Sequence, residues 1–318
     1  LLAALSDGTC RPIQVASPNK RSNPRRDDIT KYDNDLYWEL NADNTDAFVN
    51  RSSVSGYLNL MERIKTEIIK RHIDVYDYFA ALTVAQSLKQ LPAPALELLE
   101  LACHRLMLKH SEVDRLRGRF PSWLIPVVNS QTRKIVEYML WLDVKLKRKE
   151  YLDFVRGLTP IILAIFDMYV SQSLGLAMEN YCQKRGKVLY LTRDGLSKTE
   201  EGQNILAVLD AYFAPYRDGF YASAPLTAII NAYAKEPNVV DRVNLLRQVE
   251  ESVRNIAAHE IVYVDDDFIR RQCGHTPREI FDALKYLIHT VIPMPKDAWE
   301  SYNEMNRLLK TYLQPQQA

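Results

Sequence analysis

Apolar residues recur every three or four positions from about residue 55 onward, which is the period of an amphipathic helix. The first two predicted helices have these apolar faces: Leu58, Met61, Ile64, Ile68 and Ile69, followed by Tyr76, Phe79, Ala80, Thr83 and Val84. A third helix is expected within 92–110, where prolines open it, and a longer one from about 130 to 148. This part of the chain is therefore predicted to be helical.

Start and stop signals continue the helical pattern through the middle of the chain. We expect Thr159 to cap a helix that has Pro160 in its first turn, and Gly186 to end that segment. After it the pattern predicts a short strand at 187–191 and a turn at 193–195. Two further helices are expected, one starting near Ser197 and one over 223–234.

The last third of the chain is predicted to be helical as well. Residues 238–262 are interpreted as one long helix with this apolar side: Val243, Leu246, Val249, Val253 and Ile256. Thr276 and Glu279 have the spacing of a capping box at the start of the next helix. The final helix has one apolar stripe and is expected to dock on the body of the protein through Trp299, Tyr302, Met305, Leu308, Leu309 and Tyr312.

The first 45 residues follow a different pattern. Residues 1–6 resemble the end of a helix that stops at Asp7-Gly8, and a short strand is expected within 10–18. A helix end followed by a strand predicts the remnant of an α/β domain, and the polar stretch 33–53 is interpreted as a linker. Because the chain has no initiator Met and starts inside a helical pattern, we expect an N-terminal piece to be missing.

Composition and charge narrow the class of protein. At 318 residues the chain is long enough for two domains. The apolar fraction of 47% and the charged fraction of 25% are those of an ordinary soluble protein. The net charge of +1 excludes a global basic field, so a nucleic-acid site would have to be local.

The cysteines and the apolar runs indicate the compartment. The 4 cysteines are scattered and form no Cys-x-x-Cys pair, which argues against a zinc site or a disulfide framework. A reducing, cytoplasmic location fits this usage best. The most apolar run, 161–170, is interrupted by Asp167 and is too short to span a bilayer, so no membrane association is expected.

An arginine followed by a histidine five residues later occurs three times, at Arg105/His110, Arg254/His259 and Arg270/His275. The first pair fits a basic last turn that complements a helix dipole. The third pair lies at a corner, where one helix stops at Gly274 and the next is capped by Thr276. Both are interpreted as structural, although the third pair could line a groove beside a site.

The pair Arg254/His259 differs because it lies well inside a predicted long helix. Positions 257 and 258 are both alanine, so another helix can approach closely, and Asn255 shares a face with His259. An arginine can clamp phosphate oxygens, an imidazole can transfer protons at neutral pH, and an amide can orient the histidine or a ribose. RNA cleavage of this kind requires no metal, because the 2′-hydroxyl is a built-in nucleophile. The alternative is that His259 is a hydrogen-bonded histidine in a seam between helices.

Two charged runs remain. Asp265, Asp266 and Asp267 could suggest a divalent metal, but consecutive helical residues point in different directions, so a helix start or a solvated run is favoured. The basic cluster Lys145, Lys147, Arg148 and Lys149 is interpreted as a solvated face, which could guide RNA phosphates if it faced Arg254. No Gly-rich phosphate loop, Gly-x-Ser-x-Gly elbow or His-Glu-x-x-His helix occurs in the chain.

The stretch "RNIAAHE" resembles the Arg-x4–6-His motif of HEPN ribonuclease domains, in which a polar residue commonly follows the arginine. Residues 10–40 resemble the end of a CARF domain, so the chain is similar in layout to the CARF–HEPN ribonucleases of type III-A CRISPR systems. The resemblance implies a mainly α fold with three parts. These are a remnant of an α/β Rossmann-like CARF domain with a linker, a helical linker domain and an α-helical HEPN domain, at 1–45, 46–150 and 151–318.

The resemblance also implies a function, namely metal-independent cleavage of single-stranded RNA in antiviral defence, with a 2′,3′-cyclic phosphate product. Arg254, Asn255 and His259 would be the catalytic residues, with no cofactor. Residues five apart on a helix differ by about 140° in direction, so one copy makes a poor pocket. A homodimer with one composite site resolves this, and cyclic oligoadenylate bound to the dimeric CARF domain would activate the full-length protein. The alternatives are a non-catalytic helical module for dimerisation or RNA binding, and a nucleotide sensor whose function resides in the missing domain.

Overall fold

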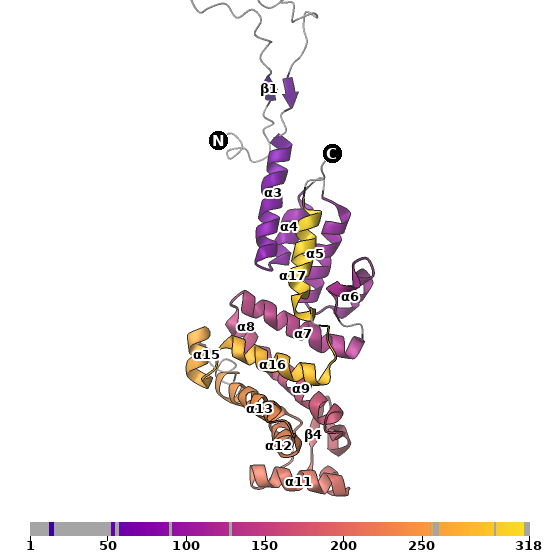
Figure 1. Ribbon diagram of the computed structural model, residues 1–318, viewed down its shortest axis with the longest axis vertical. Coiled ribbons are helices and arrows are strands. Elements are labelled where there is room, and N and C mark those ends of the chain that lie inside the picture. The colour runs from indigo at the N-terminus through magenta and orange to yellow at the C-terminus, as the bar shows by residue number, and fades with distance from the viewer. Residues whose placement is uncertain are drawn as a thin grey trace, which may run out of the picture.

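The computed structural model is an elongated, mostly helical chain (Figure 1). It describes the backbone of residues 13–15, 52–54, 57–88, 91–126, 129–254, 256, 261–295 and 297–314. The side chains of the same residues are described, apart from those of 13–15, 52–54, 57–60, 130, 131 and 254. An upper group of helices is built mainly from the first half of the chain and a lower group from the second half, and the C-terminal helix returns to the upper group (Figure 1).

The upper group contains the helices predicted between residues 55 and 110. Its members are α3 (Tyr57–Asp74), α4 (Tyr78–Gln86), α5 (Ala93–Leu106), α6 (His110–Arg117), the 3₁₀ turn η3 (Ser122–Leu124) and α17 (Ser301–Tyr312). The C-terminal α17 packs against α5, η3 and α3. The docking expected for the final helix is confirmed, with Tyr302, Met305 and Leu309 buried.

The apolar faces predicted for α3 and α4 are wrong in part. Ile69 is buried as expected, but Ile64 and Ile68 are exposed, because α3 is covered along one side only. In α4 the buried side chains are Tyr78, Ala81 and Ala85, whereas Phe79 is exposed. Because alanine is small, Ala81 and Ala85 allow α4 to lie close to its neighbours α3 and α5. The predicted face contains larger apolar side chains, so the apolar pattern alone did not reveal this close packing.

The lower group surrounds the apolar helix α9 (Leu158–Gln172), which packs against α12, α16 and α7. The other members are α7 (Ser130–Lys147), α8 (Tyr151–Arg156), α11 (Glu200–Phe213), α12 (Ser223–Tyr233), α13 (Pro237–Val249), α15 (Asp266–Cys273) and α16 (Pro277–Val291). Among the described residues one stretch, Tyr151–Gln172, has the length and composition to cross a membrane. Since 56% of that window is buried inside the protein, it has the pattern of a core helix.

Two signals predicted around α9 are wrong. Thr159 caps no helix, because α8 leads into α9 through Gly157 alone, and the Thr159 hydroxyl is buried without a hydrogen-bond partner among the described residues. Gly186 ends no helix either. Its φ of +64° places it in the tight turn of a β-hairpin, a conformation that glycine adopts without strain.

The hairpin belongs to a small antiparallel sheet with the strand order β3-β4-β5. Its strands are β3 (Cys182–Arg185), β4 (Val188–Leu191) and β5 (Gly219–Phe220), so the strand predicted over 187–191 is confirmed. The turn predicted at 193–195 is wrong, because Thr192 caps the short helix α10 (Arg193–Ser197) by accepting a hydrogen bond from the Gly195 backbone at 3.1 Å.

At the other end of the chain, β1 (Ile13–Val15) pairs with β2 (Ser52–Val54) in antiparallel register. The strand predicted within 10–18 is therefore confirmed over three residues. The helix end predicted at 1–6 and nearly all of the expected α/β remnant lie outside the described residues. The domain boundary proposed at residue 150 stays a prediction. Helices on either side of that residue pack together, α17 on α5 and α7 on α9.

Arg105 joins several elements of the upper group. It is buried, and its guanidinium makes two hydrogen bonds to Glu137 of α7, at 2.9 and 3.0 Å. Further bonds reach the Leu124 carbonyl at 3.1 Å and the Ser301 hydroxyl at 2.9 Å, and the Tyr302 ring lies 4.3 Å away. The structural interpretation of this arginine is confirmed, and it lies in the basic last turn of α5 as predicted, but its partners come from three distant segments.

Candidate functional site

The segment with the Arg254–His259 motif follows α13, and the helix predicted over 238–262 is confirmed in part. Helix α13 leads directly into the turn η5 (Glu250–Arg254), which is π-helical, and Ile256 is helical again, whereas residues 261–265 are neither helix nor strand. Asp265 then caps α15 in an extended conformation. A π-helical turn is uncommon and frequently marks a functional site.

The predicted catalytic residues lie at the edge of what the structure describes. The backbone of Arg254 forms the last residue of η5, while its side chain lies outside the described part. Asn255 and His259 lie outside the described residues, as do the twin alanines between them. Their convergence therefore stays a prediction, and the described neighbours define the frame that positions them.

Apolar side chains anchor the motif segment on both sides. Val249 and Val253 are fully buried before it, and Val264 is buried after it. The turn η5 packs against α15, α9 and α8. The chain is therefore held in the core just before Arg254, at Val253, and again at Val264.

A buried polar network holds the start of η5 in place. Arg247 of α13 donates to Glu250 at 2.9 Å and to Glu251 at 2.6 Å, and the Ser223 hydroxyl at the start of α12 also donates to Glu250. The side chain of Gln248 reaches the Cys273 carbonyl of α15 at 3.3 Å. These residues were not predicted from the sequence, although an arginine with carboxylates three and four positions later is a recognisable helical pair.

Replacing Glu250 with alanine should lower the free energy of unfolding by about 2–3 kcal/mol, because Arg247 and Ser223 lose a buried acceptor. The loss should also slow RNA cleavage, since η5 carries the backbone of Arg254. Urea denaturation followed by circular dichroism measures the first effect. Glu251→Ala is the matched control and should change stability by less than about 0.5 kcal/mol, because this side chain is exposed. Equal effects of the two substitutions would contradict the role of the network.

The corner after the motif has the structure predicted for it. Asp265 accepts the Phe268 amide as an N-cap, so the acidic run is a helix start. Gly274 ends α15 with a φ of +77°, and Thr276 forms the expected capping box with Glu279. Arg270 and Arg271 lie exposed on α15, with Arg270 4.0 Å from Asp266. The structural interpretation of the pair Arg270/His275 is therefore favoured.

Carboxylates offset the charge of the basic cluster at 145–149. Lys145 lies 2.6 Å from Glu150 and 2.8 Å from Asp153. Lys147 lies 2.8 Å from Asp143, and Arg148 lies 2.7 Å from Glu150. The cluster is thus part of an ion-pair network on the protein surface, which favours the structural interpretation over a role in guiding RNA.

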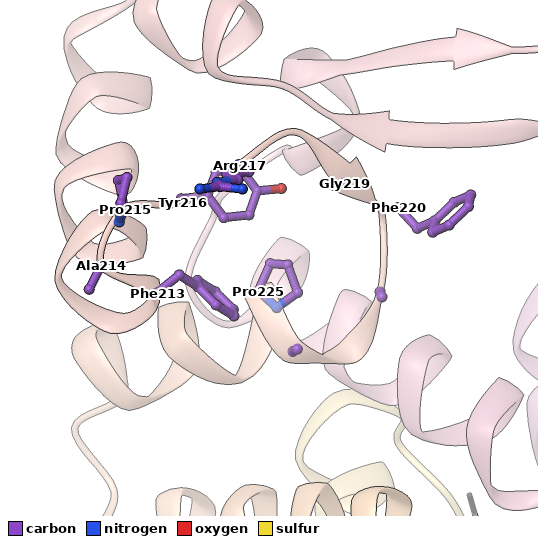
Figure 2. A pocket seen from close by; sticks show the side chains of 10 residues that line it. Phe213, Ala214, Pro215, Tyr216, Arg217, Gly219, Phe220 and Pro225 are labelled. Atoms are coloured by element: carbon purple, nitrogen blue, oxygen red, sulfur yellow. The ribbon is translucent and has the colours of Figure 1, made fainter.

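An open hollow of about 520 Å³ lies between the end of α11 and the start of α12 (Figure 2). Its lining is mostly apolar and includes Phe213, Pro215, Tyr216, Arg217 and Pro225. Burial raises the pKa of Tyr216 to about 12, so this hydroxyl is no base at neutral pH. Among the described residues no carboxylate or imidazole lines the hollow, so these lining residues are unsuited to acid–base catalysis.

Comparison with known proteins identifies the class. Residues 124–310 match the Csm6 HEPN domain family, and residues 55–106 match the 6H domain of the CRISPR-associated protein Csm6. The fold and the match across the Arg–His segment define a CRISPR-associated protein with a HEPN domain. The chain belongs to the Csm6 HEPN domain family.

Two known proteins are similar to most of this chain. The "CRISPR system endoribonuclease Csm6" of Mycobacterium tuberculosis is 27% identical over 274 residues, which is 86% of this chain and 62% of that protein. The structure titled "Enterococcus italicus Csm6 bound to cyclic hexa-2'-fluoro-hexa-dAMP" is 17% identical, covers 94% of this chain and 68% of its own, and has a TM-score of 0.67. The mainly α fold expected from the sequence is confirmed.

Proposed function

We propose that this protein is a metal-independent endoribonuclease that cleaves single-stranded RNA. The observation that carries the proposal is the match to the Csm6 HEPN domain family over 124–310, since that range contains Arg254, Asn255 and His259 in the spacing of the HEPN motif. A relative named an endoribonuclease supports the same activity. The π-helical turn at Arg254 adds a local irregularity of the kind found at functional sites.

The chemistry follows from the three side chains. Arg254 holds the non-bridging oxygens of the scissile phosphate, and Asn255 orients the histidine or the ribose. The 2′-oxygen attacks phosphorus as it loses its proton, the bond from phosphorus to the 5′-oxygen breaks, and the 5′-oxygen gains a proton. His259 takes part in these proton transfers. The products are a 2′,3′-cyclic phosphate and a 5′-hydroxyl, and the atoms balance without a metal or a cofactor.

A homodimer completes the site in this proposal. Because Arg254 and His259 differ by about 140° in direction on a regular helix, one chain presents them poorly to a single phosphate. Two chains related by a two-fold axis bring both motifs to one place. The side chains of Ile261 and Tyr263, directly after the motif, are almost fully exposed in the single chain. Two apolar side chains in that position suit a contact with a second copy.

Regulation belongs to the longer protein. The chain spans 62% of the length of its curated relative, and the Enterococcus italicus structure holds a cyclic oligoadenylate analogue. We propose that cyclic oligoadenylate, bound through a dimeric CARF domain, activates the full-length protein in the cytoplasm during CRISPR antiviral defence. Titrating the chain, extended to the relative's length, with cyclic oligoadenylates of different ring sizes tests this directly.

Cleavage should continue in excess EDTA and should stop when the 2′-hydroxyl at the cleaved position is replaced by hydrogen. The reason is that the ribose hydroxyl, rather than a metal-bound water, is the proposed nucleophile. A fluorescent single-stranded RNA and its variant with a single deoxyribose, resolved on a denaturing gel, provide the measurement. Loss of cleavage in EDTA, or cleavage 3′ to the deoxyribose, contradicts the mechanism.

A further inference from the structure

The β3-β4-β5 sheet presents an aromatic and basic face to solvent. The register places Gln183, Tyr190 and Phe220 opposite one another, and the pair Arg185 and Val188 lies one step along. Residues directly opposite in an antiparallel sheet share a face, as do positions two apart in one strand. All five side chains therefore lie on one face of the sheet.

This face is open, whereas the other turns toward the core. Phe220 is 61% exposed, and Gln183, Arg185 and Val188 are exposed as well. On the opposite face Leu191 is fully buried. The rings of Tyr190 and Phe220 lie 4.9 Å apart, and the Arg185 guanidinium lies 4.7 Å from the centre of the Tyr190 ring. The Arg185 guanidinium therefore lies over the half-buried Tyr190 ring, and the exposed Phe220 ring is tilted against it by 38°.

The β3-β4 hairpin itself carries basic residues and no acidic one. Residues 182–191 contain Lys184, Arg185 and Lys187, of which Lys184 lies on the opposite face of the sheet from Arg185. These three cations make no salt bridge within the part of the chain that the structure describes, unlike the paired cluster at 145–149. Arg217, beside β5, lines the adjoining hollow (Figure 2). An anionic ligand would thus find cations whose charge is not already neutralised.

We propose that this sheet face, defined by Arg185, Tyr190 and Phe220, binds single-stranded RNA. Exposed aromatic rings stack with unpaired bases, whatever the base, while neighbouring arginines and lysines bind the phosphates. A duplex is excluded from this mode, because its bases are already stacked and paired. An acidic peptide would use the cations but would leave the exposed rings without stacking partners, so RNA accounts for both features.

A short path of bonds connects this face with the candidate active site. Strand β5 ends at Phe220, and Ser223, which begins α12, donates its hydroxyl to Glu250 at the start of η5. Between them, the Tyr221 amide bonds the Leu189 carbonyl at 2.9 Å and so extends the pairing with β4. These bonds join the sheet to the start of η5, the turn that carries the backbone of Arg254. The binding of RNA at this face does not depend on the proposed function. Only the statement that the bound RNA is also the cleaved substrate rests on it.

The binding of RNA can be measured apart from its cleavage. In a His259→Ala background, a fluorescein-labelled oligouridine is titrated with protein while its fluorescence anisotropy is followed. Tyr190→Ala combined with Phe220→Ala should weaken binding about tenfold or more, as expected for the loss of two stacking platforms. Arg185→Gln with Lys187→Gln should lower the slope of log K against log salt by about 1.4, because each phosphate contact contributes roughly 0.7 on single strands.

Matched variants separate stacking from a general loss of structure. Phe220→Trp should retain affinity and Phe220→Leu should lose it, since both fill space but only tryptophan stacks. Trp123→Ala with Arg115→Gln removes another exposed aromatic side chain and an exposed cation, from η3 and α6, and should leave binding unchanged.

Three results overturn this inference: unchanged affinity after loss of both rings, an unchanged salt slope after loss of both cations, or equal affinity for a duplex of the same length. A sheet face that binds an acidic peptide but no RNA overturns it as well. Cleavage by the His259→Ala protein would contradict the proposed function instead, and the anisotropy result would stand independently of it.

Discussion

Replacing Arg105 with alanine should lower the free energy of unfolding by about 3–5 kcal/mol, because it leaves the Glu137 carboxylate buried without its partner. Burial by itself lowers the pKa of Arg105, but Glu137 and the neighbouring tyrosines raise it, so the guanidinium stays charged. The same guanidinium bonds the Leu124 carbonyl and the Ser301 hydroxyl. One substitution therefore removes the hydrogen bonds that join α5 to α7, η3 and α17.

Urea denaturation of the variant and its partners checks this expectation. Glu137→Leu should destabilise the protein by a similar amount, because it leaves the arginine charge unpaired. Arg105→Met combined with Glu137→Leu should recover much of the loss, since two apolar side chains need no partner. Arg115→Ala is the control for an exposed pair and should change stability by less than about 1 kcal/mol. A double variant no more stable than the single ones would show that packing, rather than charge, dominates here.

Short sequence patterns predicted helices and strands correctly where the contacts that stabilise an element lie within that element. The helix over 130–148, the strand at 187–191 and the capping box at Thr276 needed only neighbouring residues. Thr159 shows the limit of this approach. It has the residue type and the following proline of an N-cap, yet the preceding helix runs into α9 and leaves no exposed end to cap.

The three arginine–histidine pairs show why spacing alone does not identify a site. Arg105 has the same spacing as Arg254, but its role is decided by Glu137 and Ser301, which lie 32 and 196 positions away. Long-range burial of this kind leaves no local pattern.

His259→Ala should slow RNA cleavage by about 10²–10⁴-fold, the usual contribution of a group that transfers protons in the transition state. The free energy of unfolding should change little, because the catalytic role requires the imidazole to face the RNA rather than the core. Arg254→Ala should have a comparable effect on cleavage through loss of the phosphate contact. The pair Arg270/His275 supplies the control, since Arg270→Ala and His275→Ala make the same chemical changes at the corner between α15 and α16 and should leave cleavage intact.

Mixing the two inactive proteins then distinguishes a composite site from a site within one chain. Equal amounts of Arg254→Ala and His259→Ala protein, after subunit exchange, should form about half mixed dimers. If the two motifs share one site, a mixed dimer retains one arginine and one histidine there, so cleavage should reappear in the mixture. Different affinity tags on the two proteins allow the mixed dimer to be isolated and assayed. An isolated mixed dimer as inactive as its parents would place Arg254 and His259 of the same chain in each site, and the second copy would then serve stability alone.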